Sequence, residues 1–128
     1  MEKMTTYGYG PHLTLDLGDC DVTILNDLNI CFAFLNELPS RIGMNKITQP
    51  YVFRYDETTP EECGVTGFVV IAESHISLHT YPEKKFVFVD VFSCKPFDIK
   101  EAEKYIVSFF GSKSPVVQKI SRGEKFPQ

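Results

Sequence analysis

Chemically reactive side chains gather in one stretch in the middle of the chain. The apolar run Gly-Phe-Val-Val-Ile-Ala at residues 67–72 leads directly into Glu-Ser-His-Ile-Ser-Leu-His-Thr-Tyr-Pro-Glu at residues 73–83. Polar groups beside a core strand lower stability unless they are paired with one another or used in chemistry. This polar stretch is therefore the first place to look for a functional site.

Three general kinds of chemistry are open to these residues. His75 and His79 could share a metal ion on a helix, but the segment has a β-type composition, and on a strand they would lie about 13 Å apart. The HExxH motif is also missing, so we predict no metal site. Ser74 lies outside a G-x-S-x-G motif and has no evident acid partner, which disfavours a serine hydrolase. Simple pairing of polar groups at a strand end accounts for each residue taken alone.

Two helices are predicted, one before and one after the polar stretch. Asp21 stands at an N-cap position, and the apolar pattern behind it predicts a helix that ends before Pro39. The second helix begins with a capping-box pattern at Asp98 and ends at Gly111. The apolar faces of the two helices consist of Leu25, Leu28, Phe32 and Leu35, and of Ala102, Tyr105, Ile106 and Phe109.

Strand patterns account for most of the remaining chain. The candidates are residues 12–17, 46–55, 67–72, 76–80, 86–92 and 116–120. The continuous apolar run at residues 67–72 is typical of a strand buried on both faces. The order of the elements predicts an α+β fold, a two-layer α/β sandwich in which two helices cover one face of a mainly antiparallel sheet.

Composition and charge narrow the possible functions. The 128 residues suit a single domain, 1–128, and a net charge of −4 offers no basic face for nucleic acid. We find neither a run of about 20 apolar residues, as a membrane helix needs, nor a signal peptide, so we expect a cytoplasmic protein without a membrane partner. Four widely spaced cysteines are expected to be thiols. Eleven Phe and six Tyr predict a sheet face covered by a second subunit, hence at least a homodimer.

The polar stretch and its surroundings resemble a known signature. Ala-Glu-Ser-His-Ile-Ser-Leu-His-Thr-Tyr-Pro-Glu at residues 72–83, followed by Val-Asp-Val-Phe-Ser-Cys at residues 89–94, is similar to the signature of prokaryotic-type S-adenosylmethionine decarboxylases. The likeness extends to Gly-Val-Thr-Gly at residues 64–67 and to an early Gly-x-His-Leu at residues 10–13. It covers most of the chain.

The resemblance implies a pyruvoyl-dependent decarboxylase that is made as a proenzyme. Ser74 would attack the carbonyl of Glu73, cut the chain into residues 1–73 and 74–128, and become a covalently bound pyruvoyl group. His79 would assist this processing as an acid/base, Thr66 would support the same step, and Cys94 would return a proton to the substrate. The pyruvoyl group then serves as an electron sink. Because Ser74 and His79 are an odd number of residues apart, we expect a bend or bulge between them.

The resemblance also implies S-adenosylmethionine as the small-molecule substrate, whose product is the aminopropyl donor for spermidine and other polyamines. Tyr81 and Glu83 stand at the positions that contact adenine and ribose. Tyr51, Phe53 and Tyr55 could stack on adenine, although ordinary alternate packing in a strand explains each of them slightly better.

Two alternatives to this assignment stay open. The connection after Tyr55 is longer and more acidic than in the family pattern, and its carboxylates could bind the basic side chain of ornithine or arginine instead. Those carboxylates are Asp56, Glu57, Glu61 and Glu62. A paralogue that keeps the fold without processing, and acts as a binding subunit, is the non-enzymatic alternative.

Overall fold

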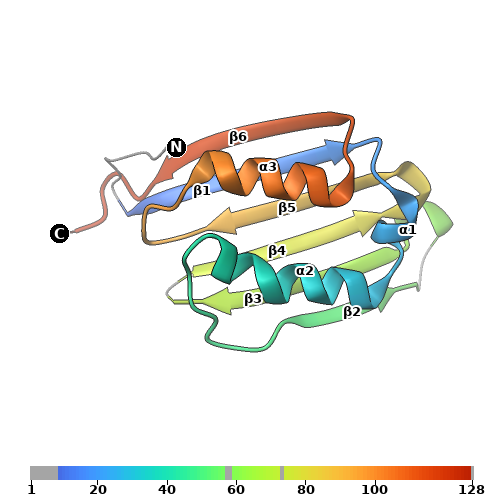
Figure 1. Ribbon diagram of the computed structural model, residues 1–128, viewed down its shortest axis with the longest axis horizontal. Helices are drawn as coiled ribbons and strands as arrows, with labels where there is room; N and C mark the ends of the chain where they lie inside the picture. The colour runs from blue at the N-terminus through green and yellow to red at the C-terminus, as the bar shows by residue number, and fades with distance from the viewer. Residues whose placement is uncertain (1–8, 57–58, 73, 128) are drawn as a thin grey trace.

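Six strands within residues 9–56, 59–72 and 74–127, the part of the chain that this computed structural model describes, form one antiparallel sheet (Figure 1). Their order across the sheet is β2-β3-β4-β5-β1-β6. The strands are β1 (Gly10–Gly18), β2 (Tyr51–Tyr55), β3 (Gly64–Ile71), β4 (Ser74–Tyr81), β5 (Phe86–Phe92) and β6 (Ser114–Arg122).

The described residues form three α-helices rather than the expected two, and these lie on one face of the sheet (Figure 1). The α-helices are α1 (Val22–Leu25), α2 (Leu28–Arg41) and α3 (Ile99–Phe110), and the short 3₁₀ helices are η1 (Pro60–Glu62) and η2 (Pro82–Lys84). Helix α2 packs on β2 and β3, and α3 packs on β1. The two-layer α+β sandwich with an antiparallel sheet is confirmed.

The first predicted helix is divided in two. Asp21 caps α1 as expected, but the chain leaves the helix at Asn26, and Asp27 caps a new helix by accepting the amide N–H of Ile30 at 3.0 Å. This break changes the phase of the apolar face. Phe32, which we expected in the core, is 38% exposed, whereas Phe34 is fully buried.

The end of α2 and the environment of β3 also differ from the prediction. Helix α2 continues through Pro39 to Arg41, because a proline in the last turn removes only one helical hydrogen bond and its ring is buried. Strand β3 is buried on its helix-facing side alone. Val69 on that side is inaccessible, but Phe68 on the other side is 43% exposed. We call this other side, which the helices do not cover, the open face.

The core lies between the sheet and the two long helices, α2 and α3. At the centre of this core, Phe34 of α2 packs against α3. Its ring centroid lies 4.9 Å from that of Phe109 and 4.9 Å from that of Phe110, both on α3. The Tyr105 ring stacks nearly parallel to it at 6.3 Å. Phe34 therefore connects α2 to α3 above the sheet.

Phe34→Ala should lower the free energy of unfolding by about 3–5 kcal/mol, because it opens a cavity where the helices meet. Phe32→Ala on the same helix is the matched control and should cost at most about 1 kcal/mol, since its ring is partly in solvent. Urea unfolding at one protein concentration, with both changes made in an uncut Ser74→Ala chain, measures the difference. Equal costs would contradict the burial described here.

Candidate active site

The residues expected to do chemistry occupy opposite ends of β4. This strand pairs with β3 in continuous register, from Ile71 opposite Ser74 to Thr66 opposite His79. The expected bend or bulge between Ser74 and His79 is therefore wrong for one chain. Ser74 is on the helix-covered face and His79 on the open face, about 16 Å apart at 3.3 Å per residue.

The first cluster lies at the turn between β3 and β4. Ser74 begins β4 and is only 8% exposed. Cys94, which follows β5, donates a hydrogen bond from Sγ to the carbonyl oxygen of Ala72 at 3.5 Å. Glu73 lies outside the described residues. The fold thus brings the Cys94 thiol to the hairpin turn that contains the expected cleavage position.

Ser93 positions Cys94, a role that the sequence analysis missed. It is fully buried, and its Oγ accepts the amide N–H of Lys95 at 3.0 Å and donates to the Lys95 carbonyl at 2.9 Å. Gly10 on β1 approaches so closely that a Cβ there would lie 1.8 Å from the Ser93 carbonyl oxygen. Gly10 and Ser93 both belong to the motifs quoted above. Only their contact in the folded chain shows the structural role of Ser93.

The second cluster lies at the other end of β4, on the open face. Thr66 Oγ1 and His79 Nδ1 form a hydrogen bond of 3.3 Å across β3 and β4. A cavity of about 130 Å³ opens beside them. Its lining residues are Tyr55, Glu62, Gly64, Thr66, His79, Thr80 and Tyr81. Thr66 and His79 therefore belong together, as the resemblance implies, and they share a cavity with two of the expected substrate contacts.

The four residues expected to contact the substrate do not all line the same cavity. Tyr55 and Tyr81 line the His79 cavity, and Phe53 is adjacent, opposite Thr66 in the strand register. Glu83, in η2, instead lines a neighbouring cavity of about 510 Å³ together with Arg54. The structure thus groups the aromatic residues with His79, whereas Glu83 lines a separate cavity.

The acidic connection after β2 is partly engaged within the protein. Asp56 pairs with Arg54 at 3.1 Å, and Glu62 accepts a hydrogen bond from the Thr59 hydroxyl at 3.1 Å. Glu57 lies outside the described residues, and Glu61 is exposed. The connection is therefore not a row of unengaged carboxylates around a basic substrate.

The open face carries many aromatic side chains. Those exposed by 40% or more and lying on this face are Tyr51, Phe53, Tyr55, Phe68 and Phe88. Exposed apolar surface of this extent is unusual in a protein that works as a monomer.

A charged group on the same face is satisfied internally. His12 Nε2 lies 3.0 Å from Asp90 Oδ1, and its Nδ1 lies 3.4 Å from Arg122 Nη1. Because a guanidinium can only donate, Nδ1 must accept, and a neutral His12 then donates from Nε2 to Asp90. The Arg122 guanidinium also covers the Phe92 ring at 4.5 Å. These groups can therefore be covered by another apolar surface without leaving unpaired charges.

In the described part of the chain, no three His, Cys, Asp or Glu side chains are arranged to hold a metal ion. None of the helices described is both long and apolar enough to cross a membrane.

The fold and the residues around β4 define a small α+β enzyme with a serine at the turn of a β-hairpin and a thiol beside that turn. The family model for S-adenosylmethionine decarboxylase matches residues 11–123. The chain belongs to this family.

Individual relatives agree with this assignment. The chain is 36% identical over 121 residues to an S-adenosylmethionine decarboxylase proenzyme of Thermodesulfovibrio yellowstonii, covering 91% of this chain and 83% of the relative. It is 33% identical over 121 residues to that of Pyrococcus furiosus, covering 94% and 81%. The crystal structure of the adenosylmethionine decarboxylase from Aquifex aeolicus superposes with a TM-score of 0.77 at 26% identity, covering 96% of this chain and 100% of the other.

The four cysteines differ in reactivity because they differ in burial. Burial raises the pKa of the Cys20 thiol to about 11 and that of the Cys31 thiol to about 12. At pH 8 the thiolate, which is the reactive form, makes up only about a thousandth of Cys20 and less of Cys31. Cys63 and Cys94 are partly accessible.

Iodoacetamide at pH 8 should therefore label Cys63 and Cys94 in the native protein and leave Cys20 and Cys31 unlabelled over the same period. Because both buried pKa values are raised, labelling of Cys20 and Cys31 should increase as the pH approaches 11. Peptide mass spectrometry measures each site separately. Labelling of either buried cysteine at pH 8 as fast as Cys63 would contradict the burial.

Proposed function

We propose that this protein decarboxylates S-adenosylmethionine by means of a pyruvoyl group formed from its own Ser74, and so supplies the aminopropyl donor for polyamine synthesis. The observation that carries the proposal is the position of Cys94, whose sulfur lies 3.5 Å from the Ala72 carbonyl at the turn before Ser74. Membership of the family supports the same substrate. The names of the relatives give no support to ornithine or arginine.

The position of Ser74 fits a pyruvoyl group. Ser74 is the first residue of β4 and pairs with Ile71, so a cut before it opens a two-residue turn and leaves the strand pairing intact. In the proposed cut, the Ser74 hydroxyl attacks the preceding carbonyl and the peptide becomes an ester. Elimination then frees the carboxylate end of residues 1–73 and leaves a dehydroalanine at position 74, which takes up water and loses ammonia to become the pyruvoyl group. The two pieces stay together because β4 remains paired with β3, and β1 remains paired with both β5 and β6.

When present, the pyruvoyl group supplies an electron sink for loss of carbon dioxide. The surrounding residues have separate tasks. We assign Cys94 the proton that returns to the substrate carbon, since its thiol is held at the turn by Ala72. We assign nucleoside contacts to Tyr55 and Tyr81, whose rings line the His79 cavity. A ribose contact by Glu83 stays a prediction.

If two copies pair through their open faces, Thr66 and His79 of one copy would lie at the Ser74 end of β4 in the other. Within one chain β4 separates them by about 16 Å and places them on opposite faces. A two-fold axis near Ser77, in the middle of β4, would bring His79 of one copy to the Ser74 end of the other. The exposed aromatic residues of the open face and the internal pairing of Asp90 support a second copy as the partner.

The purified protein should consist of two chains, residues 1–73 and 74–128, the second beginning with a pyruvoyl group, and it should release labelled carbon dioxide from carboxyl-labelled S-adenosylmethionine. Denaturing mass spectrometry and a radiometric assay measure the two properties. Ser74→Ala should abolish both, because alanine has no hydroxyl to attack the preceding carbonyl. An uncut chain, or release from ornithine or arginine but not from S-adenosylmethionine, would overturn the proposal.

Subunit complementation tests the shared site. A Ser74→Ala chain and a Thr66→Ala/His79→Ala chain should each remain uncut alone. When the two are expressed together with different tags, the Thr66→Ala/His79→Ala chain should be cut, since its Ser74 meets an intact Thr66 and His79 from the partner. Mixed dimers recovered through both tags in which neither chain is cut would show that the site lies within one chain.

A further inference from the structure

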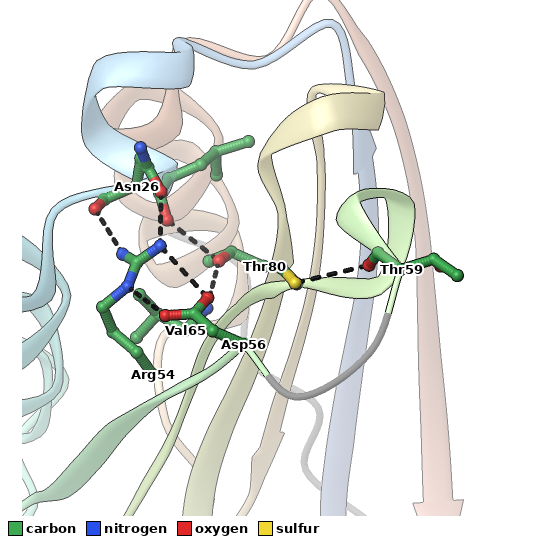
Figure 2. A network of polar contacts seen from close by, with 8 residues as sticks. Asn26, Arg54, Asp56, Thr59, Val65 and Thr80 are labelled. Carbon is green, nitrogen blue, oxygen red and sulfur yellow. Dashed lines mark hydrogen bonds and ion pairs between the residues drawn. The ribbon is translucent and has the colours of Figure 1, made fainter.

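Arg54, near the end of β2, joins three segments of the chain (Figure 2). Its Nη1 donates to the Asn26 carbonyl at 2.8 Å, and its Nη2 donates to Asn26 Oδ1 at 2.9 Å. Its Nε donates to Asp56 Oδ2 at 3.1 Å. The guanidinium thus ties the end of α1 to the residue that leaves β2. A planar fork of donors can make this set of bonds, whereas a lysine ammonium has no fixed geometry to do so.

A second set of bonds holds the same end of α1 to the sheet. Thr80 Oγ1 accepts the amide N–H of Val65 at 2.8 Å and donates to the Leu25 carbonyl at 2.9 Å (Figure 2). Thr80 is buried and lines the His79 cavity. Thr80 therefore fixes the end of α1, and Arg54 ties the edge strand β2 to that fixed point.

The consequence for the site follows from alternation along β2. Arg54 lies opposite Val65, on the helix-covered face, so the next residue, Tyr55, points to the open face. Strand β2 is at the edge of the sheet and has β3 as its one neighbour, which leaves its end prone to fraying. The bonds of Arg54 to Asn26 and Asp56 flank Tyr55 and oppose this fraying, and Tyr55 lines the His79 cavity.

The bonds of Arg54 should contribute little to the overall stability of the protein. The Arg54 side chain is 36% exposed and that of Asp56 is 51% exposed, and exposed ion pairs contribute little to the free energy of unfolding. The structural value of the group is local, at the end of one edge strand.

We propose that Arg54 is a positioning residue that sets the affinity of the active site for its substrate by holding Tyr55 in the cavity beside His79. This inference rests on the proposed function. It assigns Arg54 no part in making or breaking bonds, so its loss should weaken binding and leave self-cleavage and the chemical step intact.

The test compares steady-state decarboxylation of S-adenosylmethionine by processed Arg54→Ala, Arg54→Lys and unaltered protein. Arg54→Ala should raise KM about tenfold with kcat within about twofold, which is the pattern of lost binding. Arg54→Lys should recover part of the affinity. Arg41→Ala is the matched control, since Arg41 covers the Tyr105 ring at 4.3 Å away from the site, and its KM should not change.

Three further readouts make the result decisive. Melting temperature and the fraction of cut chain should be unchanged in Arg54→Ala, whereas amide hydrogen exchange at Tyr55 should be faster. An unchanged KM and exchange rate, or an equal rise of KM in Arg41→Ala, would overturn the inference. If the unaltered protein released no carbon dioxide, the proposed function would fail, and the exchange comparison would still decide whether Arg54 holds Tyr55.

Discussion

The alternation of side chains along an uninterrupted β4 is the constraint on which the rest of the site depends. A regular strand sends neighbouring side chains to opposite faces, and the pairing of β4 with β3 and β5 leaves no room for a local exception. Ser74 and His79 are consequently separated by both the face and the length of the strand. Each end of β4 has its own neighbours: Cys94, after β5, bonds to Ala72 in the turn before Ser74, and Thr66 bonds to His79 between β3 and β4.

The separation of Ser74 from His79 bears on the role of the open face. The helices cover one side of the sheet, and the other side keeps a set of exposed rings around a charged group that is already paired. If two open faces packed together with their β4 strands antiparallel, the Ser74 end of one β4 would lie over the His79 end of the other. The same operation would bury the aromatic residues and bring the His79 end of each copy to the Ser74 end of the other.

The connection between β2 and β3 is anchored where it leaves β2 and where it enters β3. Here Arg54 and Thr80 attach the end of β2 and the start of β3 to the same short helix (Figure 2). The glycine at position 64 contributes as well, because a Cβ there would lie 2.0 Å from the Thr80 carbonyl oxygen.

The sequence by itself determined the layer architecture and most of the strands, because hydrophobic period and capping residues are local properties, and its motif spacing predicted which residues react. Asp98 and Gly111, for example, bound α3 as predicted. Local patterns could not place the break at Asn26, which moved Phe34 rather than Phe32 into the core. They also could not show that Ser93 supports Cys94 or that Arg54 holds Asn26, since these contacts join residues far apart in the chain. Only the tertiary structure decided that Ser74 and His79 lie apart, because strand register is set by pairing with neighbours.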